Sequence, residues 1–172
     1  MAAVSRWQCD RAVGASGAIQ FHGVITDEDG RRVPNVLIET WHSAGDDNNA
    51  ATKIGRLRCD GRNYTLPKSV ITDQQGRYSM RMVPPRAPEH GTAPFIAVSV
   101  HARGLLDRLI TRAYLPGCHL AKDSLLRRLP AERRQALIAT RDDIGLRFDI
   151  TLRPAIYVTA EISDEPLPEA AK

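Results

Sequence analysis

The sequence predicts an all-β protein, a β-sandwich with a short helical insertion near residues 123–139. Three observations support this fold class. Apolar and polar residues alternate along several short runs, most clearly over 95–103, and this period of two is typical of strands with one buried face. A run of mostly β-branched residues occupies 36–41 and also favours a strand. Clusters of turn-forming residues at 27–30 and 73–76 separate the runs, as expected for a sandwich of short strands.

The expected elements follow in chain order. The first strand is expected at 19–25, where apolar residues alternate around Gly23, and the second at 36–41. Residues 42–69 show little periodicity, so we expect a long and mostly irregular excursion there. The alternation at 70–82 predicts a hairpin, after which three prolines exclude a regular central strand.

The run at 95–103 is the most informative strand. One set of alternate residues is wholly apolar and is expected to face the core: Ile96, Val98, Val100 and Ala102. The other set ends in two polar residues and is expected to open toward solvent or a cleft: Phe95, Ala97, Ser99, His101 and Arg103. Later strands are expected at 109–115 and 148–152, with a further one possible at 156–162.

The helical insertion has its own local signals. Asp123 or Ser124 can cap a first turn at 125–129, because a short polar side chain accepts hydrogen bonds from free backbone N–H groups. Pro130 suits the first position of a second helix at 131–139.

The length of 172 residues suits one domain. We predict a flexible N-terminal arm at 1–16, the β-sandwich at 17–162, and a disordered acidic and proline-containing tail at 163–172.

The formal net charge is +4, but the basic residues form no stripe with interleaved aromatics, so we expect no nucleic-acid partner. A small anionic substrate or an acidic partner subunit would account for the positive net charge equally well. No apolar run approaches membrane-spanning length, so a cytoplasmic protein with no membrane partner is expected.

Several segments together resemble the intradiol ring-cleaving dioxygenases. Their order and spacing are the specific feature, since each motif alone is common: 23–35, 36–41, 71–78, 109–114 and 147–152. The resemblance implies that family's type of β-sandwich. It also implies a reaction in which a catechol bound to Fe(III) is opened by O2, with the iron held by two tyrosines and by two histidines placed two apart on one strand.

The resemblance places these four ligands at Asn49, Pro88, Phe95 and Ala97 of this sequence. None of these residue types supplies a phenolate or an imidazole, which are the ligands implied for Fe(III). The resemblance therefore implies that this chain binds no metal and is inactive alone. It implies instead that Fe(III) lies in a partner beta chain, which would be the catalytic chain.

Two segments, 101–104 leading to 111–114 and 133–139 ahead of 147–150, resemble the alpha-type chains of two-chain members that cleave protocatechuate. The implied role is to support cleavage of protocatechuate to 3-carboxy-cis,cis-muconate in the beta-ketoadipate pathway. Arg103 is then a candidate for binding the substrate carboxylate in the partner chain's pocket, because guanidinium binds carboxylate through a planar fork. Arg103 could instead bond a carboxylate of the partner. Two other classes stay open: a free-standing β-sandwich binding module, and an iron enzyme with unusual ligands.

Overall fold

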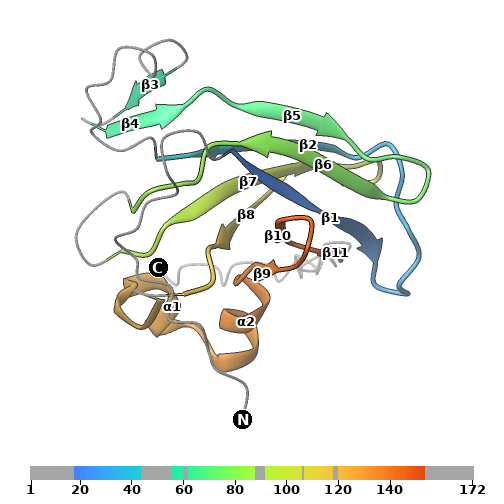
Figure 1. Ribbon diagram of the computed structural model, residues 1–172. Coiled ribbons are helices and arrows are strands. Elements are labelled where there is room, and N and C mark those ends of the chain that lie inside the picture. The colour runs from blue at the N-terminus through green and yellow to red at the C-terminus, as the bar shows by residue number, and fades with distance from the viewer. Residues whose placement is uncertain are drawn as a thin grey trace, which may run out of the picture.

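The computed structural model describes residues 18–43, 56–59, 62–87, 92–105, 107–117 and 120–153. Within these ranges two β-sheets pack against each other (Figure 1). The predicted β-sandwich is therefore confirmed. The arm at 1–16, the possible strand at 156–162 and the tail at 163–172 lie outside the described residues, and their assignments stay predictions.

The first sheet is built around β1 (Ile19–Asp27). This strand pairs antiparallel with β6 (Arg77–Met82) and parallel with β10 (Leu146–Arg147) and β11 (Ile150–Leu152). A short strand, β9 (Thr140–Arg141), continues the sheet beyond β10. The first described strand is thus hydrogen-bonded to the last, so the sheet forms only when both ends of the domain come together.

The second sheet is wholly antiparallel. Its strands, in spatial order, are β5 (Lys68–Ile71), β2 (Leu37–His42), β7 (Phe95–His101) and β8 (Leu109–Tyr114). A separate hairpin consists of β3 (Arg56–Cys59) and β4 (Arg62–Thr65). The described residues within 42–69 are therefore mostly strand, against the expectation of an irregular chain, whereas 44–55 and 60–61 lie outside the described residues. These strands have four residues each, which is too short for their periodicity to stand out.

The core lies between the sheets and contains the predicted apolar set of β7. Ile96, Val98 and Val100 are fully buried there, with Phe21 and Ile25 of β1 opposite them in the same cluster. The other face of β7 was predicted to open toward solvent or a cleft. This prediction is wrong for the middle of the strand. Ala97 and Ser99 are buried, each flanked in register by larger residues of β2 and β8.

The helical insertion comprises η2 (Leu120–Lys122), α1 (Ser124–Arg128) and α2 (Ala131–Ala136), which lie at one end of the sheets (Figure 1). Asp123 caps α1, as predicted, by accepting hydrogen bonds from two backbone N–H groups. Pro130 is the N-cap residue of α2 and not its first helical residue. No helix in the described ranges is long and apolar enough to cross a membrane.

Helix α2 ends at Ala136, three residues before the predicted end. The chain leaves the helix because it pairs with β8. The Tyr114 N–H donates to the Leu137 carbonyl at 2.8 Å, and the Ala139 N–H donates to the Tyr114 carbonyl at 2.9 Å. A tertiary contact therefore replaces the last turn that local sequence favours.

Candidate functional site

Two of the four predicted ligand positions lie on the outward face of the second sheet. Phe95 and Ala97 are two apart on β7 and share a face, as the alternation requires. Ala97 is opposite Trp41 of β2 on one side and opposite Arg112 of β8 on the other. Phe95 is opposite Tyr114. The two other predicted positions, at 49 and 88, fall outside the described residues.

Phe95 belongs to a cluster of four side chains, with Arg112, Tyr114 and Asp123. The Arg112 guanidinium carbon lies 4.4 Å from the centre of the Phe95 ring, a distance typical of a cation–π contact. The Phe95 and Tyr114 rings are 5.5 Å apart. Arg112 Nη1 donates to the Tyr114 hydroxyl at 3.3 Å, and that hydroxyl donates to Asp123 Oδ1, also at 3.3 Å. The cluster therefore joins β7, β8 and the N-cap of α1.

Tyr114 in this cluster is held in its neutral form. Its side chain is fully buried, and burial is the largest cause that raises the pKa of the Tyr114 phenol above its ordinary value. The nearby carboxylate of Asp123 acts in the same direction, while Arg112 opposes it. A phenol with a raised pKa donates a hydrogen bond well but is a poor source of phenolate.

Arg103 lies at the other end of β7. It is exposed in the turn that follows the strand, where Gly104 adopts a left-handed φ of 84°. Strands rise about 3.3 Å per residue, so roughly 20 Å of strand separates Phe95 from His101. The structure therefore does not bring Arg103 together with Phe95 and Ala97 in this chain.

A polar group lies at the end of β7, just before Arg103. His101 Nε2 lies 3.0 Å from Glu39 Oε2 and 3.2 Å from Ser99 Oγ. Both contacts use the same ring nitrogen. A nucleophile-activating histidine needs one nitrogen for the nucleophile and the other for the orienting carboxylate, so this group is a hydrogen-bonded cluster and not a catalytic triad.

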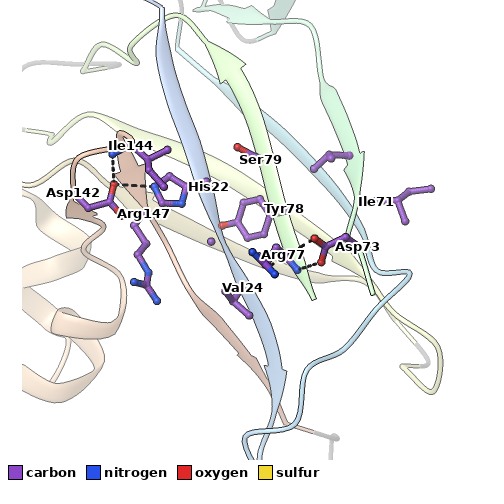
Figure 2. Close-up of a pocket in the computed structure, with 12 residues that line it drawn as sticks. His22, Val24, Ile71, Asp73, Arg77, Tyr78, Ser79, Asp142, Ile144 and Arg147 are labelled. Carbon is purple, nitrogen blue, oxygen red and sulfur yellow. Dashed lines mark hydrogen bonds and ion pairs between the residues drawn. The ribbon is translucent and has the colours of Figure 1, made fainter. Parts of the chain in front are cut away.

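A groove of about 560 Å³ is lined by strands of the first sheet and by Val70 and Ile71 of β5 in the second sheet (Figure 2). His22 and Asp142 stand on one side of it, with His22 Nε2 3.0 Å from Asp142 Oδ1. The same carboxylate oxygen accepts the Ile144 and Gly145 N–H groups, and the Gly145 hydrogen bond is the largest cause that lowers the pKa of Asp142.

The arginines of this groove already have carboxylate partners. Arg147 pairs with Asp149 at 2.8 Å, and Arg77 pairs with Asp73 at 3.8 Å. We therefore do not assign the groove a reaction.

Comparison of the sequence with known proteins identifies the family of this chain. The sequence profile of a family described as "Dioxygenase" matches residues 4–154. The protocatechuate 3,4-dioxygenase alpha chain of Burkholderia cepacia is 36% identical over 138 residues, which are 76% of this chain and 70% of that relative. The chain belongs to the intradiol dioxygenase family. The beta chain from the same organism is 30% identical over 152 residues, which are 76% of this chain and 62% of that one.

Solved structures support the family's fold. The hydroxyquinol 1,2-dioxygenase of Pseudomonas putida DLL-E4 matches with a TM-score of 0.58 at 14% identity, over 83% of this chain and 58% of that one. The dioxygenase domain of a carbohydrate-binding fusion protein from Streptomyces sp. SirexAA-E matches with a TM-score of 0.56 at 19% identity, over 84% of this chain and 86% of that one. This intradiol dioxygenase family member thus has the β-sandwich of its relatives.

Intradiol dioxygenases are ring-cleaving oxidoreductases and are generally iron-dependent, so the fit of iron to this chain can be tested on its side chains. Phe95 and Ala97 offer no donor atom, and the Tyr114 phenol is engaged with Arg112 and Asp123. The described part of the chain also has no group of three or more His, Cys, Asp or Glu side chains placed to hold a metal. The described residues do not fit a ferric ion.

Sequence reasoning missed Arg112 and the His22–Asp142 pair. Arg112 belongs to a recognised strand, but its contact with Phe95 depends on the register between β7 and β8. His22 and Asp142 are 120 residues apart. One available signal was the Asp-x-x-Gly pattern at 142–145, which is typical of a turn in which the aspartate accepts backbone N–H groups.

Proposed function

We propose that this chain is the alpha-type, non-iron-binding subunit of a two-chain intradiol dioxygenase, acting in the cytoplasm. In this proposal a catalytic beta chain holds Fe(III) and opens protocatechuate with O2 to 3-carboxy-cis,cis-muconate, a step of the beta-ketoadipate pathway. The observation that supports it is the replacement of both strand histidines by Phe95 and Ala97, on a face where Arg112 and Tyr114 are already hydrogen-bonded. Similarity to both an alpha and a beta chain is consistent with a chain that has a related partner.

The test is co-expression of this chain with a candidate catalytic beta chain. We expect the two chains to copurify, the complex to contain iron, and protocatechuate to drive O2 uptake. The chain alone should show neither uptake nor the visible absorption of ferric phenolate. A chain that is coloured, binds iron and opens catechols without a partner would disprove the proposal. A chain that stays monomeric beside every candidate partner would favour a free-standing binding module.

The proposal gives Arg103 the role of binding the substrate carboxylate across the chain interface. Arg103 is exposed and has no ion-pair partner among the described residues. In the assembled complex, Arg103→Ala should raise the KM for protocatechuate about tenfold or more, because a charge-assisted pair is lost. Turnover of catechol, which lacks the carboxylate, should not change. The measurement is steady-state O2 uptake with both substrates.

Arg108→Ala is the matched control, since Arg108 is also exposed and precedes the neighbouring strand β8. It should leave the KM for protocatechuate unchanged. An unchanged KM in Arg103→Ala, together with weaker binding between the chains, would instead assign Arg103 to a carboxylate of the partner.

A further inference from the structure

The side chain of Arg112 crosses the two strand positions at which relatives of this chain are expected to hold a metal. Its backbone is in register with Ala97 on β7. Its guanidinium lies over the Phe95 ring, 4.4 Å from the ring centre. Phe95 and Ala97 point to the same side of the strand. Arg112 is itself exposed, so its side chain covers both positions from the solvent side, where a metal bridging two side chains would have to lie.

Arg112 also brings a permanent positive charge to this space. A guanidinium stays protonated in proteins. It contacts the Phe95 ring and the neutral hydroxyl of Tyr114. No carboxylate lies within ion-pairing distance of it in the part of the chain that the structure describes. The nearest described carboxylate of the cluster, Asp123, is reached only through the Tyr114 hydroxyl. The guanidinium therefore has no direct ion pair with a described residue, and its charge faces any second cation placed at 95 or 97.

We infer that the exposed Arg112 is a cation that covers the position of the metal, so that this face of the chain excludes metal by charge and by volume and not only by lack of ligands. The inference deepens the proposed non-iron-binding role and rests on it. It predicts that restoring the two histidines alone does not restore metal affinity. A divalent ion at about 5 Å from a guanidinium is repelled strongly enough, even in a water-like dielectric, to lose roughly tenfold or more in affinity.

The test is to rebuild the histidine pair with and without the guanidinium. Phe95→His with Ala97→His places two imidazoles two apart on one strand, an arrangement able to chelate Ni(II). Addition of Arg112→Gln should then tighten Ni(II) binding at least tenfold, measured by calorimetric titration of the purified chain. The matched control adds Arg81→Gln instead. Arg81 is exposed on β6 of the other sheet, so this control removes the same net charge at a distance and should leave the affinity of the double variant unchanged.

Equal Ni(II) affinity of the double variant and of its Arg112→Gln derivative would overturn the inference. An equal gain from Arg81→Gln would overturn it as well, because net charge would then be the cause. Thermal melting checks that each variant is folded. Arg112→Met, which keeps a long side chain against the ring at 95, replaces Arg112→Gln if the latter does not fold. Ferric iron bound tightly by the unmodified chain would defeat the proposed function separately, whatever the two engineered affinities are.

Discussion

Replacement of Gly23 by alanine is expected to lower the unfolding free energy of the protein strongly. A Cβ atom at this position would lie 2.0 Å from the Phe148 carbonyl oxygen, 2.7 Å from the Phe148 carbonyl carbon and 3.0 Å from Cε1 of Tyr78. Two of these three atoms are backbone, so no side-chain rotation relieves the clash. Gly23 is thus required for the close approach of β1 to the segment between β10 and β11.

The opposing backbone at Phe148 is held by hydrogen bonds on both sides, so moving it away from Gly23 costs free energy. The Phe148 N–H donates to the His22 carbonyl at 2.8 Å, and the Tyr78 hydroxyl donates to the Phe148 carbonyl at 2.5 Å. Burial of the Tyr78 phenol raises its pKa far above the ordinary value, so it remains a donor. Moving Phe148 would break both hydrogen bonds and the parallel pairing beside them.

We expect Gly23→Ala to cost at least about 4 kcal/mol of unfolding free energy, a large part of the total for a domain of this size. Urea denaturation followed by circular dichroism measures it. Gly30→Asn is the matched control. Gly30 has a left-handed φ of 79°, but a Cβ atom added there would meet nothing within 4 Å, and asparagine tolerates that conformation. The control should cost about 1 kcal/mol or less. Equal midpoints for the two variants would show that the contact with Phe148 is not rigid.

The sequence predicted those features that depend on neighbours along the chain. Alternation along 95–103 correctly identified the buried set of β7, because a strand's two faces follow from its period alone. Asp123 was correctly proposed as a helix cap, because a cap bonds to N–H groups two and three residues away. The lack of metal-binding atoms at Phe95 and Ala97 was predictable from the residue types alone.

Features that depend on register or on distant pairing were missed. The need for glycine at 23 arises from Phe148, which is more than 120 positions later in the chain. The Arg112–Phe95 contact requires the alignment of β7 with β8, and nothing in the local sequence fixes that alignment. Helix α2 was predicted too long because its last residues pair with Tyr114 instead. In each case a long-range contact decides the local structure.

His42 is expected to make the protein markedly less stable in mild acid. Its side chain is only 4% exposed at the end of β2 and faces the core side of the sheet. Nδ1 lies 3.5 Å from Thr65 Oγ1, while the buried Nε2 has no hydrogen-bond partner among the described residues. Burial, and then the positive charge of Lys68, lowers the pKa of His42 from 6.5 to about 4.

The sign of the effect follows from these two pKa values. In the unfolded chain the imidazole binds a proton below about pH 6.5, whereas in the folded chain it stays neutral down to about pH 4. Between these values the unfolded state binds more protons, so the unfolding free energy falls as the pH is lowered. The expected loss between pH 7 and pH 4.5 is about 2.5 kcal/mol, at 1.36 kcal/mol for each pKa unit. Urea denaturation at a series of pH values measures this slope.

His42→Leu should flatten the slope between pH 7 and pH 4.5 and make the protein more stable than the unmodified chain at pH 4.5. Leucine removes the titrating group and the unpaired Nε2, and the backbone N–H at 42 keeps its hydrogen bond to Thr65 Oγ1. Met82→Leu is the control, since Met82 is buried in the core but does not titrate, and it should retain the original slope. If His42→Leu retains the slope too, other groups cause the acid sensitivity, and the imidazole is reached by water or a partner that offsets its burial.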